Sequence, residues 1–154
     1  MRDLKSKALS LNFSGLAYKK QGQYSQAMED FERALAIQRE VGDRSGEGTT
    51  LTELGIVYDD LGEYSQAIEY YHQALAIQRE VGDRSGEGTT LNNLGTSYKD
   101  LGEYSQAMEY LHQALVIIRE VGARAREGRT LNNLNAVRRE FGNSANEPSL
   151  STAY

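Results

Sequence analysis

The chain repeats itself with a period of 40 residues. The stretch ALAIQREVGDRSGEGTTL occupies positions 34–51 and returns without a change at 74–91. Less complete copies lie on either side, with the same residue types one period apart: Leu51, Leu54, Gly55, Tyr58, Gly62, Tyr64, Ala67 and Ala74 recur at Leu91, Leu94, Gly95, Tyr98, Gly102, Tyr104, Ala107 and Ala114, and earlier at Leu11, Gly15, Tyr18, Gly22, Tyr24, Ala27 and Ala34. A fixed period of this size indicates a stacked array in which each unit buries its apolar face on the next. We therefore expect an extended stack and not a closed globule with one deep pocket.

Each period contains two stripes of apolar residues at helical spacing. The first stripe consists of Leu51, Leu54, Tyr58 and Leu61, and the second of Tyr64, Ala67, Ile68, Tyr71, Ala74 and Leu75. Gly62 separates the stripes, and glycine is favoured at the left-handed residue that ends many helices. The pattern predicts two antiparallel helices per unit, helix A over about 46–60 and helix B over about 64–81.

Small residues indicate where these helices approach one another closely. Gly55, Ala67 and Ala74 occupy such positions, and a larger side chain there would overpack the contact. Tyr58 and Tyr71 are the large residues expected to fill the gaps between neighbouring helices.

The connector VGDRSGEG joins helix B to the next helix A at 41–48 and again at 81–88. Gly42 suits the residue after a helix, Ser45 is the predicted N-cap of the next helix, and Glu47 favours its positive start. The glycines resemble a phosphate-binding loop, but no strand is predicted before them and no lysine follows them. Turn chemistry explains this segment, so no nucleotide site is predicted.

Composition excludes several classes of function. The 154 residues include no cysteine, which removes disulfides, thiolate metal sites and a cysteine nucleophile. No apolar run approaches the roughly 20 residues of a membrane span, and no signal-peptide core follows Met1, so a cytoplasmic protein without membrane contact is expected. The net charge of −5 argues against nucleic acid as a partner. The segment between Arg119 and Arg139 nevertheless has six Arg and two Glu, a balance of +4 against −9 elsewhere.

These residues resemble the tetratricopeptide repeat (TPR) family. The family carries a large apolar residue, then Leu-Gly and Tyr in helix A, followed by Ala, an aromatic residue and Ala in helix B. The matching positions are Leu51, Leu54, Gly55, Tyr58, Ala67, Tyr71 and Ala74, then Leu91, Leu94, Gly95, Tyr98, Ala107, Leu111 and Ala114. The first unit matches as well, except that Ser14 stands where Leu is expected. The resemblance covers 7–122 as three repeats, with a partial fourth up to Gly142.

The resemblance implies an all-α fold, a right-handed TPR superhelix of antiparallel helix pairs with three repeats and a C-terminal capping helix. The TPR domain is expected to span 1–142, and 143–154 is predicted to be a disordered tail. Within the domain, the repeats are placed at about 7–46, 47–86 and 87–126, with a partial fourth at 127–142.

The chain departs from the usual TPR pattern in its period, which is 40 residues instead of 34. Arg39, Arg79 and Arg119 replace the proline that normally closes helix B. Helix B should therefore continue for about one and a half more turns. The long period is similar to that of a subgroup that includes the Pins/LGN-type polarity adaptors and bacterial multi-TPR scaffolds.

In a TPR superhelix the A helices line a concave groove, so the resemblance implies that their non-core faces bind the partner. The candidate groove residues are Asn12, Lys19, Thr52, Ile56, Asp59, Asn92, Thr96, Lys99, Asn132 and Arg139. Asn12, Asn92 and Asn132 are equivalent, and a ladder of amides can grip the backbone of an extended peptide. Alternatively, these side chains only solvate the groove. Leu16, Ile56 and Thr96 stand where carboxylate-clamping TPR domains, and the Pins-like group, commonly carry Asn, which argues against a chaperone-tail clamp.

No set of residues predicts catalysis, a metal or a cofactor. His72 and His112 are equivalent positions in successive units and are expected to be surface histidines. Asp59 and Asp60 are sequence neighbours that point about 100° apart on a helix, so they do not form a paired-carboxylate site.

The third connector departs from the pattern, because VGDRSGEG becomes VGARAREG with the better helix formers Ala123, Ala125 and Arg126. The helix that follows carries an apolar stripe: Leu131, Leu134, Val137 and Phe141. In one account this helix folds back and caps the third repeat. In the other, the connector stays helical and the stripe docks on a second copy in a swapped homodimer.

The sequence therefore predicts a non-enzymatic protein–protein interaction scaffold that binds a peptide segment of a partner protein in its groove. Two alternatives stay open: self-association through the last helix, and a consensus-like structural array with no dedicated ligand. An enzyme or a metal protein would need a convergent polar cluster, and the sequence shows none.

Overall fold

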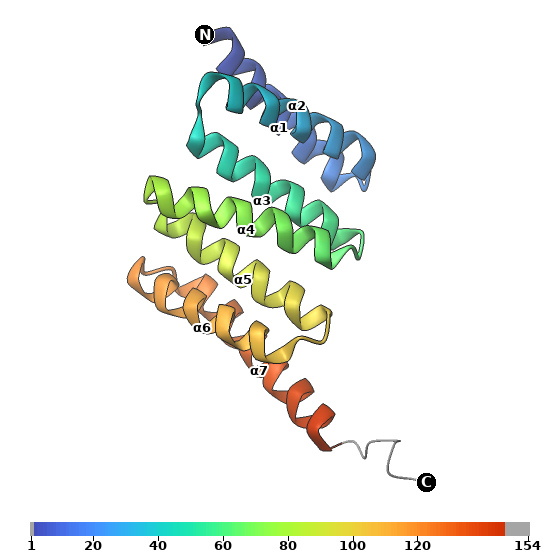
Figure 1. Ribbon diagram of the computed structural model, residues 1–154, viewed down its shortest axis with the longest axis vertical. Coiled ribbons are helices and arrows are strands. Elements are labelled where there is room, and N and C mark those ends of the chain that lie inside the picture. Colours follow the sequence, from blue (N-terminus) through green and yellow to red (C-terminus); the bar gives the residue numbers. More distant parts are fainter. Residues whose placement is uncertain (1, 147–154) are drawn as a thin grey trace.

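The computed structural model describes residues 2–146, and every regular element within them is an α-helix. The helices are α1 (Arg2–Lys20), α2 (Tyr24–Val41), α3 (Arg44–Asp60), α4 (Tyr64–Val81), α5 (Arg84–Asp100), α6 (Tyr104–Glu120) and α7 (Arg124–Asn146). The A helices α1, α3 and α5 each pack on the B helix that follows, α7 packs on α6, and the pairs stack along one axis (Figure 1). The predicted fold, three helix pairs and a C-terminal helix, is confirmed.

The predicted end of helix B is also confirmed. Helices α2 and α4 continue past Arg39 and Arg79 to Val41 and Val81, as expected when no proline interrupts them. The glycine after each helix adopts the left-handed conformation that favours this residue, with a φ of 72° at Gly42.

The predicted N-cap of helix A is wrong. Helix α3 begins at Arg44, and its cap is Asp43, whose Oδ1 accepts a hydrogen bond from the Gly46 backbone nitrogen at 3.0 Å. Ser and Asp are about equally good caps, so composition could not choose between Asp43 and Ser45. Because α2 continues to Val41, only two residues separate the helices, and the carboxylate is the side chain at the cap position.

Glycine on helix A faces a large residue on helix B, as predicted for Gly55. A Cβ atom built on Gly55 would lie 2.5 Å from Tyr71 Cε1, and one on Gly15 would lie 2.7 Å from Phe31 Cε1. Tyr71 and Phe31 are completely or almost completely buried in the core. The absence of a side chain on the A helix therefore makes room for the bulky residue on its partner.

Helix α7 folds back onto α6, as in the first of the two accounts. The chain turns at Gly122, which has a φ of 71°, so the uninterrupted helix of the second account does not occur. Leu134 and Val137 are buried against Leu111 and Leu115 of α6.

The end of α7 corrects the boundary of the expected tail. The helix continues past Gly142 to Asn146, so part of the segment expected to be disordered is helical. The rest of that segment, 147–154, lies outside the described residues. Among the residues that the structure covers, none of the helices combines the length and apolar character needed to cross a bilayer.

Candidate peptide-binding groove

The A helices form one continuous wall, because side chains join each of them to the next. Lys19 Nζ donates to Glu53 Oε2 at 2.7 Å between α1 and α3, and Ser97 Oγ donates to Asp59 Oδ1 at 2.7 Å between α3 and α5. Thr130 Oγ1 donates to Asn92 Oδ1 at 3.0 Å between α5 and α7. Among residues 2–146, no side-chain hydrogen bond joins two B helices.

Three hollows lie along this wall, one between each A helix and the next. The first hollow, between α1 and α3, has Leu9 and Asn12 on one side and Thr49 on the other. The second, between α3 and α5, repeats the arrangement with Thr49, Thr52 and Thr89. The third, between α5 and α7, has Thr89, Asn92 and Arg129. The hollows therefore follow the sequence period, with corresponding positions of successive A helices lining each of them.

Two members of the predicted asparagine ladder line these hollows. Asn12 Oδ1 lies 3.2 Å from Thr50 Oγ1, which itself donates to Gln38 Oε1 at 2.8 Å. Asn92 Oδ1 accepts hydrogen bonds from Thr130 and from Asn133 Nδ2, the latter at 3.1 Å. Asn132, the third member, is exposed on α7.

Thr52 and Asp59, two further predicted groove residues, make hydrogen bonds within the chain. Thr52 is buried and its Oγ1 donates to the Gly48 carbonyl at 3.0 Å. Asp59 accepts hydrogen bonds from Tyr71 Oη at 2.6 Å and from Ser97 Oγ. Burial raises the pKa of Asp59, and these two hydrogen bonds oppose that rise.

The other predicted groove residues differ in their exposure. Ile56 is half-buried and packs on the core between the second and third repeats. Thr96 donates to the Asn92 carbonyl on its own helix at 3.1 Å. Lys99 is half-buried, with its Nζ 4.0 Å from Asp100 Oδ1, and Arg139 is exposed on α7.

Two exposed apolar residues beside the groove were not predicted from the sequence: Leu9, which lines the first hollow, and Phe13, one helical turn further on. Both lie on α1 and are 56% and 64% exposed. They are one period before Thr49 and Glu53 of α3, which line the second hollow. An alignment of the repeats could have revealed them, because the later units have polar residues at these two positions and only the first unit has apolar ones.

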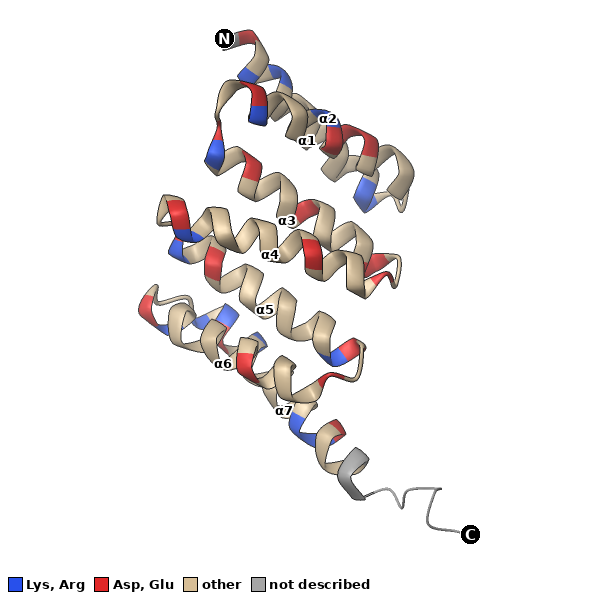
Figure 2. Ribbon diagram, in the orientation of Figure 1, with Lys and Arg blue, Asp and Glu red and all other residues tan. Residues whose placement is uncertain are grey.

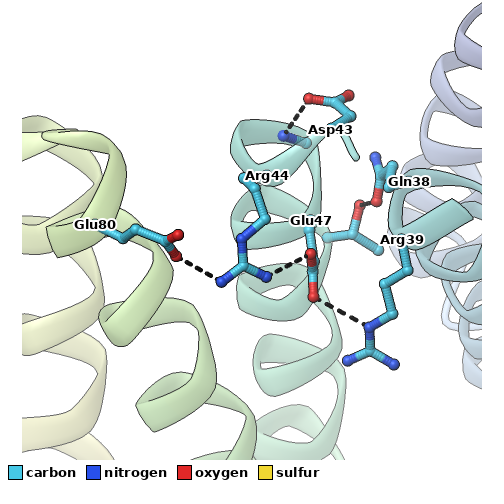
Figure 3. Close-up of polar contacts among 8 residues, drawn as sticks. Gln38, Arg39, Asp43, Arg44, Glu47 and Glu80 are labelled. Atoms are coloured by element: carbon cyan, nitrogen blue, oxygen red, sulfur yellow. Dashed lines mark hydrogen bonds and ion pairs between the residues drawn. The ribbon is translucent and has the colours of Figure 1, made fainter. Parts of the chain in front are cut away.

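The connectors carry a second set of polar contacts, on the edge of the stack where each B helix ends (Figure 3). Glu47 is buried and accepts from Arg39 Nε at 3.1 Å and from Arg44 Nη1 at 2.9 Å. Arg44 also donates to Glu80 at the end of α4. The group, which we call the arginine clamp, recurs one period later at Arg79, Glu87, Arg84 and Glu120. Its contacts are satisfied within the chain, which indicates a structural role.

The histidines show no arrangement for catalysis. His72 is exposed and packs edge-on against Tyr98 and Tyr110, which stack on each other with ring centroids 5.3 Å apart. Partial burial and, to a smaller extent, the charge of Arg79 lower the pKa of His72. Among the described residues, no group of three or more His, Asp or Glu side chains is placed to hold a metal ion.

Sequence profiles described as tetratricopeptide repeat match residues 6–80 and 88–121. Together they cover more than half of the chain, which therefore belongs to the tetratricopeptide repeat family. No curated protein matches the chain significantly.

Solved structures with the same fold include BtubC from P. vanneervenii, 24% identical over 88% of this chain and 56% of its own, with a TM-score of 0.81. The apo form of RapI is 25% identical over 92% of this chain and 39% of its own, with a TM-score of 0.85. The TPR2AB domain of yeast Sti1 in a complex with pHSP90 is 21% identical over 91% of this chain and 49% of its own, with a TM-score of 0.75. This chain thus spans about half, or less, of the length of these structures.

Proposed function

We propose that this chain is a non-enzymatic interaction module that binds an extended peptide segment of another protein along the wall of α1, α3, α5 and α7. The observation that carries the proposal is the row of three equivalent hollows between successive A helices. An extended peptide crossing the A helices would meet the hollows in turn and could place a side chain in each.

The hydrogen bonding of Asn92 supports a peptide ligand. Its Oδ1 accepts from Thr130 and Asn133, and none of the described residues accepts from its Nδ2. The amide therefore keeps two N–H donors for a ligand carbonyl while its own carbonyl is held by the protein. This arrangement orients the donor before the ligand arrives, which lowers the entropic cost of binding.

A solved structure with the same fold also supports a role in binding a partner protein. The yeast Sti1 domain, which shares the fold, is in a complex with pHSP90. The sequence argues against a chaperone-tail clamp, so we transfer only the general role, binding of a partner protein, and not that partner. The long period keeps the Pins/LGN-type scaffolds as a second source of analogy.

Self-association through α7 is disfavoured, because most of the apolar stripe that would contact a second copy is already buried against α6. Leu134 and Val137 are buried inside the chain, and Leu131 is partly buried. Phe141 is 45% exposed and packs edge-on against Tyr104. The remaining alternative is a structural array that binds no ligand. The peptide-binding experiment below tests it, because such an array would select no peptide.

The experiment selects peptides from a displayed library of random segments against the full chain, and then measures their affinity by fluorescence anisotropy for the wild type and Asn92→Asp. Aspartate keeps the acceptor for Thr130 and Asn133 but removes both N–H donors, so the affinity is expected to fall about tenfold. Gln73→Glu makes the same chemical change at an exposed position on α4 and should have no effect. Failure to select any peptide, or equal loss of affinity in both variants, would exclude this groove as the binding site.

A further inference from the structure

The two ends of the A-helix wall differ in chemistry. At the α1 end, Leu9 and Phe13 are more than half exposed and lie one helical turn apart on the same face. Leu9 lines the first hollow, and Leu16, half-buried one turn further on, extends the apolar surface. We call these three residues the apolar end of the groove.

This apolar surface reaches the groove through Leu9, which lines the first hollow. The residues of α3 that pack on the preceding helix pair include Thr50, Leu54 and Val57. Their counterparts on α1, one period earlier, are small or polar: Ser10, Ser14 and Ala17. The small and polar replacements therefore lie on the face of α1 that begins the stack, whereas Leu9 lines the first hollow. Phe13 lies one helical turn from Leu9, at the position of Glu53, whose carboxylate pairs with Lys19 on the preceding A helix.

At the α7 end, the third hollow is basic. Arg126 and Arg129 line it, at the positions that Gly86 and Thr89 occupy one period earlier. Arg126 is held by α5: its guanidinium donates to Thr89 Oγ1 at 2.9 Å and to Ser85 Oγ at 2.8 Å. In the part of the chain that the structure describes, no carboxylate pairs with either arginine.

The other hollows have no such excess of positive charge. Asp43 lines the first hollow, together with Lys5, and Asp83 and Glu53 line the second. At the third, Ala123 replaces this aspartate, so a carboxylate is lost where two arginines are gained. Figure 2 shows the basic residues gathered around the start of α7. The three near-identical units thus diverge where the groove would contact a ligand.

We infer that the partner segment is bipartite, with apolar side chains for Leu9 and Phe13 at one end and acidic side chains for Arg126 and Arg129 at the other. The inference rests on the proposed function and names the chemistry of its ligand. Leu9 lines the first hollow and the two arginines line the third, so the apolar part and the acidic part of the ligand are separated by the stretch that crosses the second hollow.

The experiment uses the same peptide library with two variants built from the chain's own repeats. Leu9→Thr with Phe13→Asn installs the residues of α5, and Arg126→Gly with Arg129→Thr installs those of the preceding connector and helix. Wild-type protein should enrich peptides that carry an apolar pair and, at a constant distance along the segment, an acidic pair. Each variant should lose about tenfold in affinity for them and should no longer enrich the corresponding half. Removing the arginines should also flatten the dependence of affinity on salt.

A third variant, Ala123→Asp, separates loss of binding from loss of folding. It restores the carboxylate that lines the other two hollows, and it also supplies the cap that α7 lacks. The protein should therefore become more stable and at the same time bind the acidic peptides less tightly.

The outcomes distinguish this inference from the proposed function. Selected peptides that depend on Asn92 but show no bipartite pattern, or that ignore both paired variants, overturn the inference and leave groove binding intact. Absence of any Asn92-dependent peptide overturns both. A homodimer that dissociates when Leu9 and Phe13 are changed shows that a second copy occupies the apolar end, which also overturns the inference.

Discussion

At the scale of single residues, the stack depends on pairs in which a glycine on helix A lies under a large residue on helix B. Gly55 and Tyr71 are the central pair, and Gly15 with Phe31 repeats it. Helix α7 has no following helix among residues 2–146, and there the glycine is replaced by the exposed Asn135. The glycine is therefore required by the neighbouring side chain and not by the helix that contains it.

Gly55→Ala is expected to lower the free energy of unfolding by about 1–3 kcal/mol, because its Cβ would clash with the buried ring of Tyr71. The control is Gly128→Ala on α7, where an added Cβ meets no atom within 4 Å. That change should stabilise the protein by about 0.5–1 kcal/mol, because alanine is the better helix former. Urea denaturation measures both, and a destabilising effect of the same size at Gly128 would contradict the steric explanation.

Asp59 was predicted to be a groove residue, but in the structure it makes hydrogen bonds between helices. It joins three helices by accepting hydrogen bonds from Tyr71 of α4 and Ser97 of α5. Burial is the largest influence on it and raises its pKa above the ordinary value of 3.8. The folded protein therefore holds this proton more tightly than the unfolded chain, and the contribution of Asp59 to stability falls as the pH rises through the raised pKa.

Asp59→Asn removes this titration. The stability of the variant relative to the wild type should therefore increase as the pH is raised from about 4 towards neutrality and should then level off. Urea denaturation at a series of pH values tests this, with the exposed Asp60→Asn as the control for general charge effects. A stability difference that does not vary with pH would refute the proposed burial of an ionised carboxylate.

At the scale of elements, the helix starts show how one side chain sets a boundary. Asp43 and Asp83 cap α3 and α5 through hydrogen bonds to the Gly46 and Gly86 backbone nitrogens. At the equivalent position before α7 stands Ala123, which has no side-chain acceptor. Helix α7 therefore starts without the side-chain contact that caps α3 and α5.

Ala123→Asp should raise the free energy of unfolding by about 1 kcal/mol, the typical contribution of an N-cap. Thermal denaturation should show a higher Tm for this variant. Ala125→Asp adds the same charge inside the first turn and not at the cap, so its gain should be smaller. Equal gains from both substitutions would mean that charge near the helix start, and not capping, is responsible.

At the scale of the whole molecule, the arginine clamp couples one repeat to the next. Glu87 is buried, with 6% of its side chain exposed, and pairs with Arg79 of α4 and Arg84 of α5. Arg84 in turn reaches Glu120 of α6. The arginine that replaces the family's usual proline thus lengthens helix B and also provides a contact to the following helix.

Glu87→Gln is expected to lower the free energy of unfolding by about 1–3 kcal/mol, because a buried carboxylate that accepts from two guanidinium groups is lost. The unfolding transition should also broaden, since stability in a repeat array depends on the coupling between neighbours. Glu127→Gln is the control: Glu127 is 30% exposed and pairs with Arg119, so its loss should cost less than about 1 kcal/mol. A larger effect at Glu127 would show that the clamp does not couple the repeats.

The features that depend on local sequence patterns could be predicted without the structure. The 40-residue period and the apolar spacing predicted the helix pairs, and Gly62 and the missing proline predicted where the helices end. The contact between Gly55 and a neighbouring helix also followed from the alternation of small and large residues. These features are readable because each depends on residues within one repeat.

Which polar side chains form hydrogen bonds within the chain could be known only from the tertiary structure. Thr52 and Asp59 have the spacing of groove residues, but their hydrogen bonds form with neighbouring backbone and side chains once the helices pack. The same holds for α7, which folds back because Leu134 and Val137 find an apolar surface on α6. A polar or apolar side chain takes the best partner within reach, and only the packing of one helix against the next brings that partner within reach.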